Sequence, residues 1–292
     1  MQRNHNYPKV CLIEKVINET HTVRTLVFSD EVMSNVLPGQ FAMVWIPGIN
    51  EIPMSVMITN ESGKAAFTVR KHGPSSTGLF NVKVGQQIGI RGPYGNSFDL
   101  KQGKLLLVGG GTGLIPMMRL LTFVTPDDDV TVLIGAKSKE EVFFEDLANN
   151  LLKKNKHQVI VTTDDGSYGK HGFVTDKLKE LIETRKIDFV LAIGPIPMMK
   201  AVADVTREKG IQTVVSLNPI MVDGTGMCGG CRATVDNKTV FVCVDGPEFD
   251  AHKVDFKTLM TRNQSYLMEE KVSVEEHDCK LNRLQPKIIL SN

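Results

Sequence analysis

The sequence predicts three parts in succession: an N-terminal antiparallel β-barrel, an α/β domain with a parallel sheet, and a small cysteine-bearing C-terminal domain. Three observations predict this order. Short β-like runs separated by turn signals fill roughly the first hundred residues. From Lys104 to about Gly210, apolar runs alternate with helical patterns. Beyond Gly210 the chain becomes rich in glycine and gathers three cysteines.

The first part contains short runs that concentrate or alternate Val, Ile, Phe and Thr. The predicted strands are Val10–Val16, Thr22–Phe28, Gln40–Ile46, Ala65–Val69 and Gln87–Ile90. Turn dipeptides such as Pro38-Gly39 and Gly92-Pro93 lie between them. Several short strands at this spacing favour a small antiparallel barrel, although a sandwich would give the same signal.

The second part alternates buried strands with helices, which is typical of βαβ units and a parallel sheet. The predicted strands are Leu105–Val108, Val130–Ile134, Gln158–Thr162 and Phe189–Ile193, and the predicted helices are Leu114–Phe123, Lys139–Asn149, Thr175–Glu183 and Met198–Glu208. In such sheets ligands bind at the carboxyl ends of the strands.

The third part begins after the helical rhythm stops. It contains a predicted hairpin that pairs Arg232–Val235 with Thr239–Val242, and then a terminal helix over Phe256–Glu270. The last twenty residues have no clear period. We therefore expect four segments: a barrel over 1–100, an α/β domain over 101–212, a cysteine-bearing domain over 213–255, and a helix with a tail over 256–292.

The composition bears on binding partners and on the cellular compartment. The 292 residues include 34 basic and 33 acidic side chains, so no bulk charge favours nucleic acid or an acidic membrane surface. No stretch reaches the roughly 18 apolar residues of a spanning helix, and no signal-peptide core is present, so we expect a cytoplasmic protein. Cys11 is predicted to be a core residue and Cys279 a surface thiol.

The strongest chemical signal is the segment that contains Asp223, Cys228, Cys231 and Cys243. Thiolates suit iron–sulfur clusters or zinc, and the glycines between them let backbone amides turn toward cluster sulfides. Asp223 stands where a fourth cysteine would complete a C-x4-C-x2-C…C pattern. Because a carboxylate can also ligate iron, these four residues are the predicted metal ligands.

Two alternatives remain for this segment. Structural zinc usually needs a second cysteine pair or histidines, and His252 is the nearby candidate in sequence. A glycine-rich loop with one distant cysteine fits zinc poorly, so an iron–sulfur site is favoured. Asp223 itself could instead be a solvated turn residue beside a three-cysteine site.

A second signal follows the first strand of the α/β part. Gly109–Gly113 forms a glycine-rich turn that would let phosphate oxygens approach the backbone and the start of the next helix. It is not the G-x-G-x-x-G fingerprint, because Leu114 stands where the last glycine should be. An ordinary tight turn is the alternative. Gly135 and Gly194-Pro195 follow two further strands at the same predicted edge, which favours a nucleotide site.

A third signal lies in the barrel. Pro53-Met54-Ser55 could present amides and a hydroxyl to a flat cofactor, and Gly73–Gly78 could wrap a pyrophosphate. Gly92–Gly95 closes this region. Each alone is more typical of a plain turn, and only their combination with the other modules favours a site.

Together these motifs resemble the ferredoxin–NADP⁺ reductase superfamily, and within it electron-transfer subunits of the dihydroorotate dehydrogenase B type. The segments Leu217–Arg232 and Val242–Asp250 further resemble the small (alpha) subunit of NADH-dependent reduced ferredoxin:NADP⁺ oxidoreductase, also described as sulfide dehydrogenase. That family has an aspartate where the dihydroorotate type has its first cysteine, and Asp223 falls there.

The resemblance implies an FAD-binding barrel, an NAD(P)-binding domain and a [2Fe-2S] domain. One departure is that Ile52 replaces the arginine of an Arg-Pro-x-Ser flavin motif, so Arg70 or Lys71 would have to pair with the FAD phosphates. The candidate cofactor-binding residues are Pro53, Met54, Ser55, Val69, Arg70, Gly73, Ser76, Thr77, Gly110, Gly111, Thr112, Gly113, Gly135, Gly194 and Pro195.

Nicotinamide chemistry moves two electrons as hydride, whereas an iron–sulfur cluster accepts one at a time, and FAD can do both. We therefore expect an NAD(P)H-dependent oxidoreductase subunit that passes electrons through FAD and the cluster to a larger flavin and iron–sulfur partner subunit. The second expectation is a partner of a dihydroorotate dehydrogenase catalytic subunit in pyrimidine biosynthesis. A reading from another class is a zinc-stabilised nucleotide-binding module without redox turnover.

Overall fold

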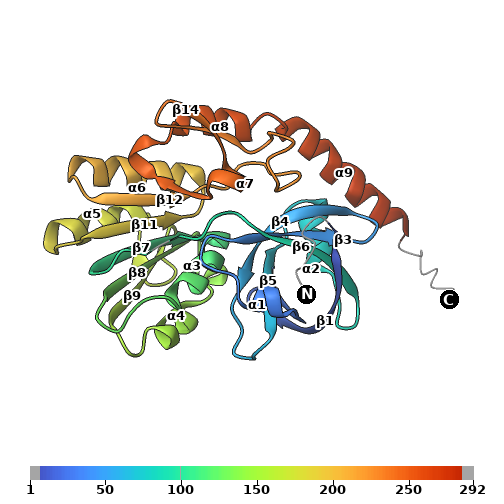
Figure 1. The fold of residues 1–292 in the computed structure, drawn as a ribbon, viewed down its shortest axis with the longest axis horizontal. Coiled ribbons are helices and arrows are strands. Elements are labelled where there is room, and N and C mark those ends of the chain that lie inside the picture. The colour runs from blue at the N-terminus through green and yellow to red at the C-terminus, as the bar shows by residue number, and fades with distance from the viewer. Residues whose placement is uncertain (1–6, 99, 285–292) are drawn as a thin grey trace, which may run out of the picture.

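The computed structural model describes residues 7–98 and 100–284, with side chains through residue 275. Figure 1 shows a barrel (blue to cyan) beside an open sheet (green to yellow), with the C-terminal segments (orange) lying across the end of the sheet. The prediction of a surface thiol at Cys279 falls outside the described side chains.

The N-terminal part is a closed antiparallel barrel in the order β1-β2-β5-β4-β3-β6, so the barrel prediction is confirmed over the sandwich. Its strands are β1 (Lys9–Asn18), β2 (Val23–Ser29), β3 (Phe41–Ile46), β4 (Asn50–Met57), β5 (Lys64–Arg70) and β6 (Gln87–Tyr94), and its helices are α1 (Glu31–Ser34) and α2 (Pro74–Phe80). Fully buried Phe28, Phe67 and Ile88 fill the interior.

The central part is a seven-stranded sheet in the order β10-β9-β8-β7-β11-β12-β15. The strands are β7 (Lys104–Gly110), β8 (Asp129–Ala136), β9 (Lys156–Thr163), β10 (Lys170–His171), β11 (Phe189–Ile193), β12 (Gln212–Ser216) and β15 (Glu248–Asp250). The helices are α3 (Leu114–Leu121), α4 (Glu145–Leu151), α5 (Val174–Thr184) and α6 (Ile196–Glu208), with short 3-10 turns η1 (Gly111–Gly113) and η2 (Lys139–Glu141). All neighbouring strands are parallel except β12 and β15, which are antiparallel.

Two predicted helices have different bounds in the structure. The helix expected over Lys139–Asn149 begins only at Glu145, because Phe144 adopts a left-handed backbone with φ 66° while its ring and that of Phe143 are buried. The terminal helix expected over Phe256–Glu270 is two helices, α8 (Phe256–Asn263) and α9 (Leu267–Leu284).

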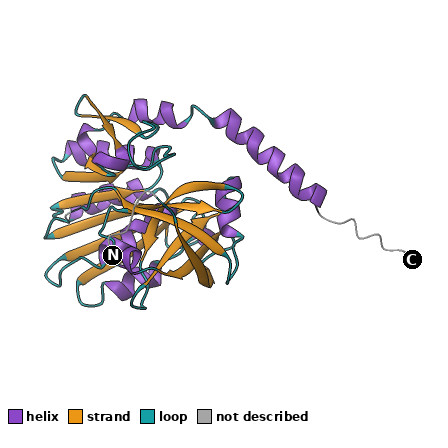
Figure 2. Cartoon of the chain, turned by 45° about the vertical axis from the view of Figure 1, so that its right-hand side comes forward, coloured by secondary structure: helices purple, strands orange, loops and turns teal. Residues whose placement is uncertain are grey.

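The predicted hairpin is present as β13 (Arg232–Val235) and β14 (Lys238–Phe241). It is followed by α7 (Val242–Asp245), by β15 and by the 3-10 turn η3 (Ala251–Lys253). Helix α9 contacts α2, and its C-terminal end extends beyond the rest of the molecule in Figure 2. No helix in the described part of the chain is both long and apolar enough to cross a membrane.

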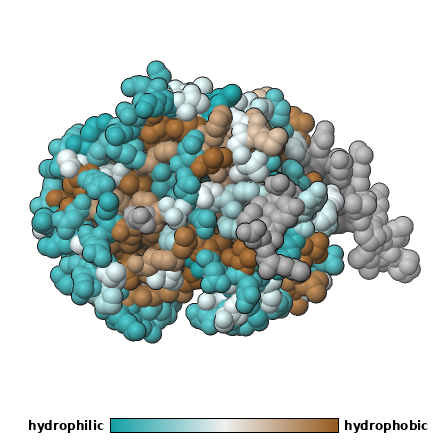
Figure 3. Space-filling view, viewed as in Figure 1, coloured by the Kyte–Doolittle hydropathy of each residue, from teal (hydrophilic) through white to brown (hydrophobic). Residues whose placement is uncertain are grey.

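The three parts share one packed body. One hydrophobic cluster joins barrel residues Val27 and Ala66 to α3 and to one face of the sheet. Another joins the opposite face to the barrel residue Met43 and to the buried Cys231 and Cys243. On the face shown in Figure 3, hydrophobic side chains (brown) gather near the middle, where the barrel meets the sheet. The cysteine-bearing segment is thus docked against both other parts.

Candidate functional site

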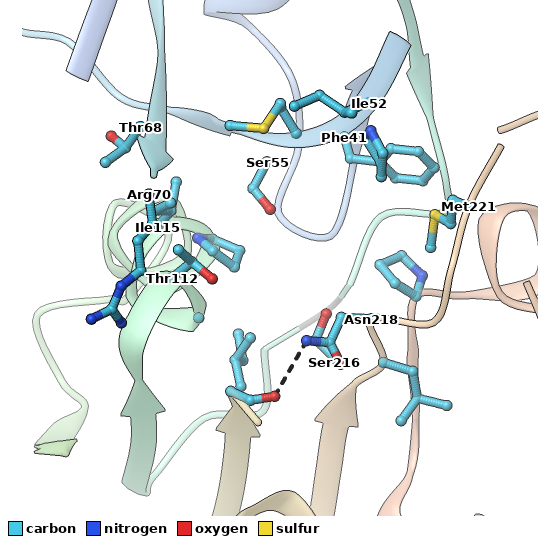
Figure 4. Close-up of a pocket in the computed structure, with 18 of the residues that line it drawn as sticks. Phe41, Ile52, Ser55, Thr68, Arg70, Thr112, Ile115, Ser216, Asn218 and Met221 are labelled. Carbon is cyan, nitrogen blue, oxygen red and sulfur yellow. Dashed lines mark hydrogen bonds between the residues drawn. The ribbon is translucent and has the colours of Figure 1, made fainter. Parts of the chain in front are cut away.

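A cavity of about 500 Å³ lies where the three parts meet (Figure 4). Its walls come from β4 and β5 of the barrel, from the turn after β7, from the end of β11, and from the loop after β12. The predicted cofactor-binding residues that line it are Pro53, Met54, Ser55, Val69, Arg70, Ser76, Thr112, Gly113 and Gly194. The structure therefore brings residues from both predicted nucleotide signals and from the barrel signal to one space.

The other candidates do not line the cavity, although several lie next to residues that do. Gly73 is the N-cap of α2, and its amide donates to the hydroxyl of Ser76 at 3.0 Å. Thr77 follows Ser76 in α2, Gly110 and Gly111 precede Thr112, and Pro195 follows Gly194. Gly135 lies near the end of β8, where it pairs with Gly110 of β7. The binding roles of all these residues stay predictions.

The barrel wall contains the position of the missing arginine and one of the two cations proposed in its place. Ile52 lines the cavity from β4, where the flavin motif would have Arg. Arg70, at the end of β5, also lines it and pairs with Glu141 at 2.5 Å across to the central domain (Figure 4 labels Arg70). Lys71 is exposed and lies outside the lining. Of the two cations expected near the FAD phosphates, Arg70 is the one placed at the cavity.

The glycine-rich turn lies against the end of β11. A side chain at Gly113 would collide with the carbonyl oxygen of Ile193, so only glycine allows this approach. Gly194, which follows directly, lies within the same contact, and Asn218 from the loop after β12 donates to its carbonyl oxygen at 3.5 Å (Figure 4). The carboxyl ends of β7 and β11 thus meet at the cavity, as the alternation of strands and helices predicts.

Sequence reasoning missed the cavity wall formed by β12 and β15. Ser216 and Glu248 line this wall, and the Ser216 hydroxyl donates to Glu248 Oε1 at 2.9 Å. Although Glu248 is half-buried as a residue, its carboxyl group lies deep among neighbouring atoms, and this burial raises its pKa to about 7. The only sequence signal was the short apolar run that becomes β12.

Two of the predicted ligands lie side by side. Cys231 and Cys243 are buried, and their sulfur atoms are 3.3 Å apart. Burial, followed by the proximity of Cys231, raises the pKa of the Cys243 thiol to about 12. Cys228 is exposed, and the Gly230 amide donates to its sulfur at 3.4 Å. A metal would have to displace these thiol protons.

Asp223 lies at the barrel side of the same loop. Its Oδ2 accepts hydrogen bonds from the amide of Thr225 at 3.0 Å and from the Thr225 hydroxyl, which lower its pKa. Arg91 of the barrel lies 3.9 Å from Oδ1. Across the described residues, no three Cys, His, Asp or Glu side chains converge as they stand.

The loop nonetheless fits an iron–sulfur cluster by its chemistry. Its donors are soft thiols and one carboxylate, and Gly224, Gly226 and Gly229 adopt positive φ values that curl the backbone around them. His252, the candidate partner for zinc, instead hydrogen bonds to the Thr206 hydroxyl of α6 at 3.1 Å. The donor set therefore matches the iron–sulfur prediction better than the zinc one.

Comparison with known proteins places the chain in a family. Residues 218–255 match the iron–sulfur cluster binding domain of dihydroorotate dehydrogenase B, and residues 107–204 match the oxidoreductase NAD-binding domain. A probable dihydroorotate dehydrogenase B electron transfer subunit of Methanocaldococcus jannaschii is 36% identical over 85% of this chain and 92% of its own length. The chain belongs to the dihydroorotate dehydrogenase B electron-transfer subunit family. A homolog of that subunit from Thermotoga maritima is 39% identical over 85% of this chain and 88% of its own length.

The likeness extends to solved structures. A chain from the structure of an NADH-dependent reduced ferredoxin-NADP oxidoreductase, studied for flavin-based electron bifurcation, has a TM-score of 0.83 and 35% identity over 92% of this chain and 98% of its own length. The FAD/NAD-binding domain of a Vibrio cholerae nitric oxide dioxygenase, at 20% identity and a TM-score of 0.61, covers 72% of this chain and 98% of its own length, and shares the fold alone.

Family membership confirms several predictions. This dihydroorotate dehydrogenase B-type chain is an oxidoreductase subunit for electron transfer, with FAD/NAD-binding and [2Fe-2S] cluster-binding domains. The predicted fold class and the predicted cofactors are therefore confirmed. The domain boundaries and the individual site residues stay predictions.

Proposed function

We propose that this chain is the small subunit of a heteromeric oxidoreductase of the NADH-dependent reduced ferredoxin:NADP⁺ type. One observation carries the proposal: a single cavity is lined by the barrel, by the nucleotide domain and by the segment that leads into the cysteine loop. When bound, FAD would take up hydride from the nicotinamide and release single electrons toward the cluster. Asp223, Cys228, Cys231 and Cys243 would hold that cluster.

The cavity residues have separable tasks in this proposal. Ser55 and Thr112 offer hydroxyls from opposite walls, one from the barrel and one from the nucleotide domain. Arg70 offers a cation at the end of β5 for phosphate groups. Pro53, Ile52 and Ile115 supply apolar surface that excludes water from the space between them. A partner subunit would receive the electrons, because the similar curated proteins are named as electron transfer subunits.

Asp223 favours this subtype over its relatives. The ferredoxin-NADP oxidoreductase chain is 35% identical to this one, and the match covers 98% of that chain. By the resemblance stated above, Asp223 stands where that family has an aspartate. The names of the similar curated proteins support a second candidate, an electron-transfer subunit that serves a dihydroorotate dehydrogenase catalytic subunit. The identity of the partner separates the two.

Anaerobic purification of the native complex, with iron and flavin analysis, tests the proposal directly. We expect FAD, two irons per small subunit, and a partner that handles NADPH and ferredoxin rather than dihydroorotate. A colourless protein that holds one zinc would contradict it, and co-purification with a dihydroorotate dehydrogenase would favour the second candidate.

The variant Cys228→Ala tests the ligands. It should lose iron and electron transfer to the partner while NADH still reduces the flavin. Cys11→Ala is the matched control, because Cys11 is a buried thiol in β1 of the barrel, away from the loop. Full iron content in Cys228→Ala would show that the ligand assignment is wrong.

A further inference from the structure

Arg91, near the end of β6, joins the barrel to the cysteine loop. Its guanidinium forms a two-pronged pair with Glu51 of β4, with Nε to Oε1 at 2.7 Å and Nη2 to Oε2 at 2.6 Å. Nη1 donates to the Tyr94 hydroxyl at 3.1 Å, and Nη2 also donates to the main-chain carbonyl of Asp223 at 3.0 Å. The same guanidinium lies 3.9 Å from the Asp223 carboxylate.

Other contacts attach the loop to this end of the barrel. Gly224, next to Asp223, has no side chain where Met43 of β3 approaches, and its φ of 84° also requires glycine. The Asn96 side-chain amide donates to the carbonyl oxygen of Val244 at 2.9 Å, and the main-chain amide of Asn96 donates to the carbonyl oxygen of Gly246 at 2.7 Å. Gly224 therefore fixes the loop on the barrel, the Asn96 contacts fix the segment that follows Cys243, and Arg91 supplies a positive charge at this junction.

The charges here are largely withdrawn from water. The Arg91 side chain is only 13% exposed and that of Glu51 22%. A charge pair in such a setting acts on its surroundings more strongly than one in solvent. The two-pronged geometry also holds the guanidinium in one orientation, which a lysine cannot reproduce.

The same contacts link the loop to the cavity wall. Glu51 precedes the cavity-lining residues Ile52 and Pro53 on β4, so one strand presents both the cavity surface and the partner of Arg91. A short chain of backbone and paired side chains thus connects this wall to Asp223.

We propose that Arg91 is a positioning residue for Asp223: it holds this ligand against the barrel and, balanced by Glu51, sets the electrostatic potential at the cluster. The inference rests on the proposed function, because it takes Asp223 as a cluster ligand. A positive charge beside the cluster stabilises its reduced form, which carries one more negative charge, and a carboxylate there opposes this.

The two members of the pair therefore have opposite predicted effects. In the purified complex, Arg91→Met should shift the cluster midpoint potential to more negative values, because it removes a positive charge and leaves Glu51 uncompensated. Glu51→Gln should shift it to less negative values. Arg91→Lys keeps the positive charge but loses the two-pronged pair with Glu51. The cluster potential of this variant should therefore lie closer to that of the wild type than that of Arg91→Met does, while the electron paramagnetic resonance spectrum of the cluster broadens. Redox titration followed by that resonance measures all three.

Arg24→Met is the matched control. Arg24 is a barrel arginine on β2 that bonds to Asn18 and to the carbonyl of Phe80, and its removal should leave the cluster potential unchanged. Equal potentials in the Arg91 and Glu51 variants, shifts of both in one direction, or iron loss in both would overturn the inference. If Arg91→Met does not assemble, the sign of the shift in Glu51→Gln and the broadened spectrum of Arg91→Lys still decide. A wild type without iron would instead defeat the proposed function itself.

Discussion

The cavity and the cysteine loop meet at one junction but are built in different ways. The cavity takes its walls from regular elements, chiefly β4, β5 and the ends of β7 and β11. The loop over residues 222–231 contains no helix or strand, and its path depends on positive-φ glycines and on contacts with the barrel. Substitutions in the cavity should therefore act through packing and ligand affinity, whereas those in the loop should act mainly through the bound metal.

The largest expected effect is the loss of iron on substitution of a buried cysteine of the loop. Cys231→Ala should abolish iron binding, because Cys231 lies 3.3 Å from Cys243 and both would ligate the same cluster. Since Cys231 is only 1% exposed, the metal-free variant should also lose roughly 1 kcal/mol of unfolding free energy. Iron analysis and chemical denaturation measure the two effects.

Cys228→Ala provides the comparison within the loop. Cys228 is exposed, so its removal should cost the iron but leave the stability of the metal-free protein nearly unchanged. Equal destabilisation by both substitutions would mean that the loop is packed as tightly as the cavity walls, against the distinction drawn above.

The second-largest expected effect comes from disturbing the backbone packing at the cavity. Gly113→Ala places a methyl group against the Ile193 carbonyl oxygen, and such overpacking should cost about 1–3 kcal/mol of unfolding free energy and weaken nucleotide binding. Gly73→Ala is the control for stability, because the space beside Gly73 is open. Chemical denaturation distinguishes the two variants, nucleotide titration compares Gly113→Ala with the wild type, and a Gly113→Ala variant with wild-type stability would contradict the close approach.

Burial explains which strands could be predicted from the sequence. Strands buried on both faces, such as Leu105–Val108 within β7, are apolar runs that reveal themselves directly. Strand β4 was missed because it contains Pro53 and is only half-buried over most of its length, so no periodic pattern marks it. β12 was missed because it is short and ends in polar residues.

The same reasoning applies to site residues. The spacing of Cys228 and Cys231 identifies them because ligands of one metal are near in sequence. Arg91 and Glu248 gave no such signal, since the partners that define their roles come from distant strands. Local pattern predicts which elements form and which motifs bind, while pairings across elements require the fold.

Glu248 extends the comparison, because it lines the cavity from β15, the strand that follows Cys243 in the chain. Its folded pKa of about 7 lies above the ordinary value of 4.5, so between these values the folded protein binds this proton more tightly than the unfolded chain. In the cofactor-free protein, the free energy of unfolding should fall by roughly 3 kcal/mol from this group as pH rises through that window.

Glu248→Gln removes the titrating group and keeps the hydrogen-bonding shape toward Ser216. Its unfolding free energy should therefore depend less on pH between about 4.5 and 7 than that of the wild type. Denaturant titrations at several pH values measure the difference. Parallel pH profiles for the two proteins would show that the carboxyl group is solvated rather than enclosed.

The smallest effect concerns the half-exposed pair at the cavity edge, Arg70 and Glu141. Exposed ion pairs contribute little, so a double-mutant cycle with Arg70→Gln and Glu141→Gln should give a coupling of about 0.2–1 kcal/mol in stability. Ligand binding should separate the two more clearly than stability does. Arg70→Gln should weaken FAD binding, because it removes the cation at the cavity and Ile52 supplies no other. Glu141→Gln releases Arg70 from its ion pair and should leave the affinity for FAD undiminished. Flavin titration of the metal-free protein measures this difference, and equal losses in both variants would assign Arg70 to the domain contact instead of the phosphates.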